Sequence, residues 1–260
     1  MTVAELGALL DFVAEVGYQL QMAGGEIYRV EESVKRLLAA YGAEHGEVFA
    51  IPNCLIVSVS HGERDVQTRV RRVGDHDTDV YRVEAINALC RKLCRQPGTL
   101  EEARRELKEV LENSRQYSTP VRLLGFFSGA MLFTLFFGGT IRDGICAGIC
   151  GAVIGVCRMA LDRVGAKVFF RTILCAAVSG LLALALVRFG AAGNADLVTI
   201  GALMTLVPGV ALTNAIRDIM VGDMISGITK LGEAVLIAIA IALGSGAAMW
   251  VSQWLGGMGI

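Results

Sequence analysis

Charged side chains are scarce in one part of this 260-residue chain. Residues 118–260 carry nine Lys and Arg and six Asp and Glu, whereas residues 1–117 carry fifteen and nineteen. Hydrophobic residues make up 54% of the sequence, which is high for a soluble enzyme. The net charge of −1 gives no reason to expect a nucleic-acid partner. We therefore expect a soluble domain at 1–117 and a membrane domain at 118–260.

Recognisable metal and catalytic motifs are also missing. None of the seven cysteines forms a C-x-x-C pair, and the three histidines lack zinc-ligand spacing. Asp75, His76 and Asp77 could bind a metal ion, but an exposed loop is the simpler interpretation of these three residues. No Ser-His-Asp or Cys-His arrangement is present in the sequence. We expect no enzyme activity, no metal and no cofactor.

The first 25 residues lack the basic start and apolar core of a secretory signal. They contain Glu5, Asp11 and Glu15 instead. The odd number of cysteines fits a reducing compartment better than a secreted disulfide scaffold. We therefore expect the N-terminal domain to lie in the cytoplasm.

The N-terminal part alternates between helical and strand periodicity. The pattern predicts helices, strands and helices in that order, with a turn at Pro52-Asn53 and a hairpin turn at 61–64. Asp77 or Thr78 is expected to cap the third helix, and Thr99 with Glu102 forms a capping-box pattern. This order predicts a small α+β domain. The expected helices are 2–22, 26–41, 79–95 and 99–112, and the expected strands are 47–51, 55–60 and 66–73.

The C-terminal part contains five apolar segments of about 17 to 24 residues, the length that crosses a bilayer. They predict five transmembrane helices at Val121–Phe137, Gly144–Leu161, Val168–Val187, Leu197–Ile216 and Leu231–Trp254. In the second segment glycines recur every three or four residues, so they share one face and permit close helix contact. These glycines are Gly144, Gly148, Gly151 and Gly155.

Basic residues favour one side of this predicted bundle. They cluster before the first segment, between the second and third, and between the fourth and fifth. This bias predicts a multi-pass inner-membrane protein with a cytoplasmic N-terminus and an external C-terminus. Trp250 and Trp254 suit an interfacial anchor near that end.

Pro208 and Gly209 interrupt the fourth apolar segment. Proline removes a backbone donor and clashes with the preceding turn, and a bilayer offers no water to the freed carbonyl. Thr213, Asn214 and Arg217 follow within about three helical turns. Broken helices with nearby polar groups build binding sites in many transporters. We expect Asn214 and Arg217 to bind a carboxylate or amino group, in a site with Pro208, Gly209 and Thr213.

Three carboxylates follow this segment, at Asp218, Asp223 and Glu233. At membrane depth such groups are candidates for proton coupling, and Asp218 or Asp223 could instead pair with Arg217. The alternative interpretation is that this stretch is a solvated cytoplasmic loop.

A second polar group opens the predicted helix 26–41. Glu26, Tyr28, Arg29 and Glu31 lie within its first two turns, and Glu26 and Arg29 share a face. One interpretation is a polar site on the cytoplasmic domain. The other is an exposed salt-bridged face, which is the commoner role of such residues.

These segments resemble the threonine/serine exporter family. Residues 24–31 are similar to its G-A-E-x-Y-R-V-E signature, with Gly25 where alanine is common. Residues 49–58 are similar to its next block, and residues 207–218 and 222–234 resemble its membrane signature. The resemblance extends over nearly the whole chain.

Full-length members of this family join two membrane units of about five spans each, whereas this chain has one. The chain is similar to the split form, in which a second small membrane protein supplies the other five spans. The resemblance implies proton-coupled export of a small carboxylate-bearing solute: threonine or serine, as in fused members, or a dicarboxylate such as succinate, as in one split pair. Membrane lipid, the second subunit and a homo-oligomer are the expected partners. The alternatives are a membrane-tethered hydrolase that acts through the N-terminal domain, or a scaffold or sensor without transport.

Overall fold

The computed structural model describes residues 2–43, 45–61, 65–74, 78–113 and 117–257, so the predicted turn at 61–64 and the Asp75–Asp77 loop lie largely outside the described residues. The chain divides into two compact units. The first contains Met1–Gln116 together with Asn214–Lys230, and the second contains Tyr117–Thr213 and Leu231–Ile260. The segment 214–230 thus groups with residues far from it in sequence.

The N-terminal elements of the first unit follow the predicted order. Thr99 and Glu102 form the predicted capping box, in which each side chain accepts the other's backbone N–H, at 3.0 and 3.3 Å. The expected cap of α3 is wrong by one or two residues, because Asp79 has that position and accepts the Arg82 N–H at 3.0 Å. The elements are α1 (Val3–Met22), α2 (Ile27–Ala40), β1 (His45–Ile51), β2 (Cys54–His61), β3 (Asp65–Arg72), α3 (Val80–Arg95) and α4 (Leu100–Glu112).

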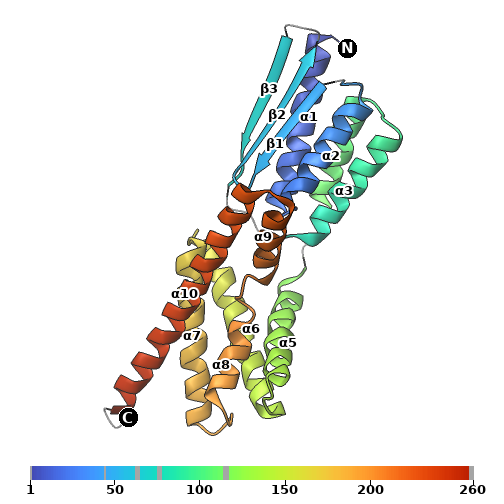
Figure 1. The fold of residues 1–260 in the computed structure, drawn as a ribbon. Helices are drawn as coiled ribbons and strands as arrows, with labels where there is room; N and C mark the ends of the chain where they lie inside the picture. The colour runs from blue at the N-terminus through green and yellow to red at the C-terminus, as the bar shows by residue number, and fades with distance from the viewer. Residues whose placement is uncertain (1, 44, 62–64, 75–77, 114–116, 258–260) are drawn as a thin grey trace. The chain divides into compact units, whose positions relative to one another are not determined.

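The three strands form an antiparallel sheet in the order β1-β2-β3, with the predicted turn at Pro52-Asn53. Alternate residues of β2 point to one face, and Leu55, Val57 and Val59 are buried there. Helices α1 and α2 cover this face (Figure 1). Gly17 permits the close approach, because a Cβ atom at this position of α1 would lie 2.6 Å from the Leu55 side chain.

A tight glycine turn separates α1 from α2. Gly24 has a φ of 79°, a left-handed conformation that favours glycine. The Gly25 N–H donates to the Leu20 carbonyl at 2.9 Å, and a Cβ atom at Gly25 would lie 2.8 Å from the same oxygen. Gly24 and Gly25 therefore end α1 and set the direction in which α2 begins.

The second unit is helical, but the prediction of five membrane spans is confirmed only in part. Among the described residues, four helices are long and apolar enough to cross a membrane: α5 (Thr119–Phe136), α6 (Ile141–Arg163), α7 (Val168–Arg188) and α10 (Met224–Gly257). The candidate span of α10 ends at Trp254. The predicted fourth span is divided into α8 (Ala195–Leu203), of 9 residues, and α9 (Gly209–Val221), of 13.

The break between α8 and α9 has a local cause. From Thr205 the backbone N–H groups bond three residues back instead of four, as in Thr205 to Ala202 at 3.2 Å. Pro208 then offers no N–H, and α9 begins at the next residue. The prediction of a broken helix at Pro208 is confirmed, whereas a fourth membrane span at Leu197–Ile216 is not.

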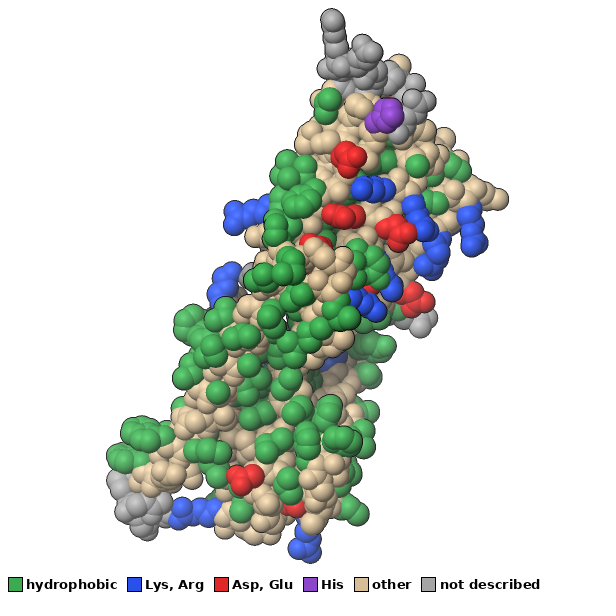
Figure 2. Space-filling model, in the orientation of Figure 1, with side chains coloured by type: hydrophobic (Ala, Val, Ile, Leu, Met, Phe, Trp, Pro, Cys, Tyr) green, Lys and Arg blue, Asp and Glu red, His purple; other side chains and the backbone are tan. Residues whose placement is uncertain are grey.

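The predicted glycine face of α6 packs against α5. A Cβ atom at Gly151 would lie 2.5 Å from the Phe126 carbonyl oxygen, and one at Gly148 would lie 2.7 Å from the Phe127 ring. Such contacts are typical of helix pairs in membranes. Hydrophobic side chains dominate the visible surface of this unit (Figure 2), and Trp250 and Trp254 of α10 are exposed.

One buried carboxylate fixes the N-terminal end of α6. Asp143 accepts the Thr140 hydroxyl at 2.7 Å, and it also accepts the Gly193 and Asn194 backbone N–H groups, at 2.7 and 3.2 Å. This carboxylate therefore ties the start of α6 to the loop before α8. Its partners give it a structural role.

Candidate functional site

The predicted site residues at the helix break divide between the two units. Pro208, Gly209 and Thr213 belong to the second unit, whereas Asn214 and Arg217 belong to the first. The Thr213 hydroxyl donates to the Gly209 carbonyl at 2.9 Å, so its donor is used within α9. A Cβ atom at Gly209 would meet no atom within 4 Å, which means that packing does not require glycine there.

The end of α9 turns back along the start of α10. Gly222 adopts a φ of 98°, and the Asp223 N–H donates to the Asp218 carbonyl at 2.9 Å. A Cβ atom at Gly227 would lie 2.9 Å from the Ala215 carbonyl oxygen. The two helix segments therefore pack closely, and the half-buried Asp223 lies at their junction.

Asp218 forms a buried ion pair across this contact. Its side chain is 2% exposed and accepts a hydrogen bond of 2.8 Å from the Lys230 ammonium, which is 11% exposed. Loss of one member of such a pair leaves a buried charge without compensation. Asp218 therefore pairs with Lys230, and not with Arg217 as one interpretation expected.

Arg217 instead contacts Glu26, which lies 191 positions away in sequence. The guanidinium of Arg217 donates to Oε1 of Glu26, and the Glu26 side chain is only 16% exposed. Asn214 lies one helical turn before Arg217 and is half-buried. The fold thus brings together the two polar groups that the sequence singled out separately.

Glu26 also contacts the first turn of its own helix. Its Oε2 atom lies 2.5 Å from Nε of Arg29, while the N–H of that nitrogen donates to the Tyr28 hydroxyl at 3.0 Å. This hydrogen bond and the charge of Glu26 raise the pKa of Arg29. Glu26 therefore accepts contacts from two guanidinium groups, one from each signature segment. We call Glu26, Tyr28, Arg29 and Arg217 the arginine–glutamate cluster.

Glu31, the remaining predicted residue of this group, has a structural partner. Its carboxylate accepts the Ala50 backbone N–H at 2.8 Å, which joins α2 to β1. The buried Gln21 amide donates to the Ile51 carbonyl at 3.0 Å and joins α1 to the same strand. The Glu31 bond holds the 24–31 and 49–58 blocks together, and the Gln21 bond adds α1 to them. Glu233 lies on α10 in the second unit and is exposed.

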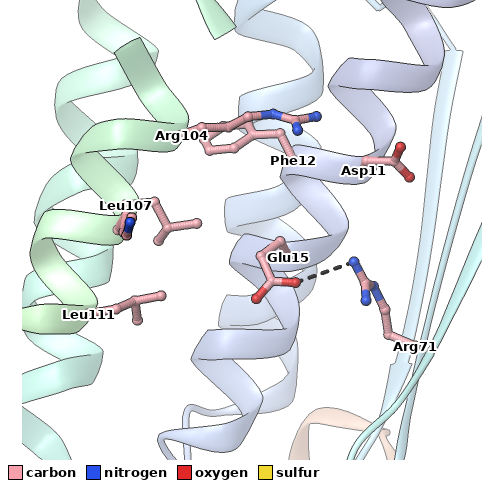
Figure 3. Close-up of a pocket in the computed structure, with 8 residues that line it drawn as sticks. Asp11, Phe12, Glu15, Arg71, Arg104, Leu107 and Leu111 are labelled. Carbon is pink, nitrogen blue, oxygen red and sulfur yellow. Dashed lines mark ion pairs between the residues drawn. The ribbon is translucent and has the colours of Figure 1, made fainter. Parts of the chain in front are cut away.

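Sequence reasoning missed a pocket of about 300 Å³ in the first unit. It lies between α1, β3 and α4 (Figure 3). The available signals were the alternate arginines of β3 and the acidic residues one turn apart on α1. The lining residues are Asp11, Phe12, Glu15, Arg71, Arg104, Leu107, Lys108 and Leu111.

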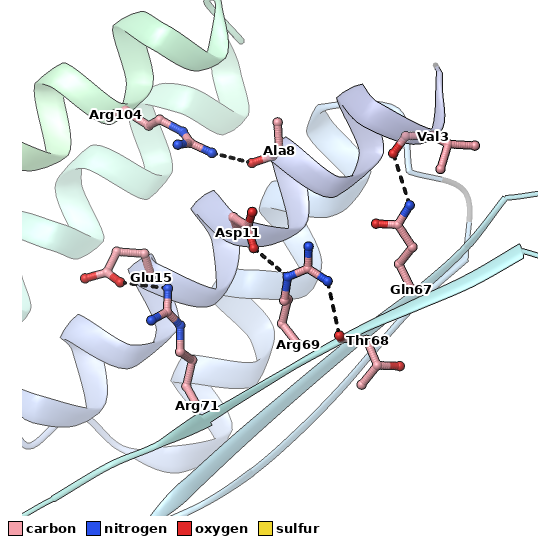
Figure 4. A network of polar contacts seen from close by, with 9 residues as sticks. All are labelled: Val3, Ala8, Asp11, Glu15, Gln67, Thr68, Arg69, Arg71 and Arg104. Atoms are coloured by element: carbon pink, nitrogen blue, oxygen red, sulfur yellow. Dashed lines mark hydrogen bonds and ion pairs between the residues drawn. The ribbon is translucent and has the colours of Figure 1, made fainter.

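A polar network surrounds this pocket (Figure 4). Arg69 of β3 donates to Asp11 of α1 at 2.5 Å, and Arg71 lies 3.3 Å from Glu15. Arg104 of α4 reaches α1 and donates to the Ala8 carbonyl at 2.8 Å. The two arginines of β3 therefore neutralise the two carboxylates of α1.

Within the described part of the chain, no group of three or more His, Cys, Asp or Glu side chains could hold a metal ion. The arginine–glutamate cluster has the donors for a carboxylate, because a guanidinium can bind one through two parallel hydrogen bonds. It has no nucleophile paired with a general base, so the arrangement favours binding over bond cleavage.

Comparison with known proteins gives a consistent result. A family model described as "Putative threonine/serine exporter" matches residues 11–252. A Mycobacterium tuberculosis protein named "Probable threonine/serine exporter" is 24% identical over 177 residues, which are 68% of this chain and 33% of that protein. The chain therefore spans about a third of that relative's length. No solved structure matches the chain.

The family match covers both units and all the signature segments described above. Exporters are transporters, so the match supports a transport role for a multi-pass membrane protein. On this evidence, the chain belongs to the threonine/serine exporter family.

Proposed function

We propose that this chain is one subunit of a secondary transporter that exports a small carboxylate-bearing solute across the inner membrane. The substrate is threonine, serine or a dicarboxylate such as succinate. Family membership supports transport, and the name of the mycobacterial relative supports an amino acid. We further propose that a second five-span membrane subunit works with this chain, as the resemblance to the split members of the family implies.

The contact between Arg217 and Glu26 is the observation that carries this proposal. Glu26 presents to Arg217 the same carboxylate group that the substrate would bring. A substrate that displaces Glu26 gains the guanidinium as a bidentate partner, and the Asn214 amide one turn away can bind its remaining polar group. Glu26 then keeps Arg29 as a partner, at 2.5 Å, so displacement does not leave it without a counter-charge.

Proton coupling requires a carboxylate that can change its protonation state during transport. Asp218 is held by Lys230, so we assign it a structural ion pair. Asp223 lies at the junction of α9 and α10, and Glu233 is exposed on α10. We propose that one of these two carries the coupled proton.

The test is transport by vesicles that contain this chain and the candidate five-span partner. Efflux of threonine, serine and succinate is compared with efflux of threonine amide, which lacks the carboxylate. We expect an imposed proton gradient to drive efflux of at least one of the carboxylates and not of the amide. Equal movement of the amide, or no flux of any solute by well-folded complexes, would contradict the proposal.

The site assignment is tested with Asn214→Ala and Arg217→Ala in the same vesicles. Arg36→Ala is the matched control, because Arg36 is an exposed arginine that pairs with Glu32 on its own helix. We expect both site variants to lose at least about tenfold in transport, which corresponds to about 1.4 kcal/mol. Normal efflux by both variants would exclude these residues from the binding site.

A further inference from the structure

The pocket between α1, β3 and α4 has an apolar floor and a charged rim. Phe12 and Leu107 are buried, and Leu111 is partly buried beside them. The volume of about 300 Å³ lies at the lower end of the range for small-molecule sites. Such a space suits a small ligand with a compact apolar body.

The charges around this floor do not cancel. Arg69 neutralises Asp11, and Arg71 neutralises Glu15. Arg104 donates to a neutral carbonyl, so its positive charge has no carboxylate partner among the described residues. Its guanidinium has five N–H donors, and one hydrogen bond to Ala8 leaves several for a ligand.

Lys108 adds a second cation one helical turn from Arg104, on the same face of α4. It lies 3.7 Å from Glu112, and both side chains are largely exposed, so that pair contributes little. Figure 3 shows Arg104 extending from α4 toward α1, and Arg104 lines the pocket together with Phe12. Two cations on one helix thus border an apolar floor.

We propose that this pocket binds a small organic anion: a carboxylate whose apolar body lies on Phe12, Leu107 and Leu111. The carboxylate contacts Arg104 and Lys108, and the apolar body excludes water from the floor. The site is separate from the arginine–glutamate cluster and does not depend on the proposed transport. It gives the N-terminal domain a ligand of its own.

The test is isothermal titration of the full chain, purified in a non-ionic detergent, with isovalerate. Isovaleramide has nearly the same shape without the charge and controls for uptake by the micelle. The binding variant is Arg104→Gln combined with Lys108→Gln. Arg105→Gln is the matched control, because Arg105 lies on α4, is 70% exposed and does not line the pocket.

We expect saturable binding of isovalerate and none of the amide. The double variant should bind at least about tenfold more weakly, because it removes both cations that contact the carboxylate. Arg105→Gln should bind as the wild type does. Leu111→Trp, which fills the floor, should abolish binding while α4 stays folded by circular dichroism.

Two results would overturn the proposal. One is the absence of saturable isovalerate binding by the folded wild type at millimolar concentration. The other is equal binding by the wild type and by the Arg104/Lys108 double variant.

Discussion

If Glu26 occupies the carboxylate site of Arg217, the two residues must affect transport in opposite directions. Glu26→Gln removes the internal competitor, so the KM for the exported carboxylate should fall. Arg217→Gln removes the group that binds the substrate, so the KM should rise. A purely structural ion pair predicts the same direction for both changes, because either one breaks the same contact.

The size of the Glu26→Gln effect follows from the exposure of the pair. The Arg217 side chain is 50% exposed, which limits the contact to about 1 kcal/mol. A competitor of that strength leaves the site open for about one sixth of the time, so its removal should lower KM about sixfold. Stability should change by no more than about 1 kcal/mol in either variant, because Arg29 continues to contact Glu26 when Arg217 is replaced.

The assay is the concentration dependence of efflux from vesicles that contain the complete transporter. Glu32→Gln is the matched control, since Glu32 lies on the same helix and forms an exposed ion pair with Arg36. It should leave KM unchanged. A rise in KM for Glu26→Gln comparable to that for Arg217→Gln would refute the competitor role of Glu26.

Three further predictions concern stability and reactivity. Gly151→Leu should destabilise the protein in detergent by about 3 kcal/mol, because a Cβ atom at position 151 would lie 2.5 Å from a carbonyl oxygen of α5. Gly125 has open space around it, so Gly125→Leu should leave the melting temperature nearly unchanged. Asp218→Asn should lower the free energy of unfolding by about 3–5 kcal/mol, because it leaves Lys230 buried without a partner. Adding Lys230→Met should restore much of that stability, and a melting temperature that does not recover would contradict the pairing. Burial raises the pKa of the Cys90 thiol to about 12, so at pH 8 it is almost entirely protonated and iodoacetamide should label it only as the domain unfolds; labelling of the native protein at the rate of a free thiol would contradict this.

The local elements were predictable because their causes are local. The capping box at Thr99 and Glu102 sets a helix start through two hydrogen bonds within four residues. The glycine face of α6 follows from spacing alone, whereas its partner helix, α5, is known only from the structure. The strand periodicity likewise predicted the three strands close to their observed positions.

Features that depend on distant contacts were not predictable in the same way. The sequence offered Glu26 and Arg217 as members of two separate groups, and only the fold joins positions 191 residues apart. The pocket depends on how α1, β3 and α4 assemble, which no single pattern describes. Pro208 showed that the helix breaks, but it did not show where α8 ends, because the irregular turns begin before the proline.

The length of α10 bears on where the proposed carboxylate site lies in the membrane. Its 34 residues extend about 51 Å, whereas a hydrocarbon core is about 30 Å thick. The part from Leu231 onward is long enough to cross alone, and its only charged residue is Glu233. Arg217, Asp218 and Lys230 therefore need no place in the hydrocarbon, where each charge would cost at least about 2.5–3.5 kcal/mol. Their grouping with the charged N-terminal unit agrees with this account. In the proposed transporter, a solute can then reach Arg217 from water, and the apolar remainder of the chain is left to form its passage through the bilayer.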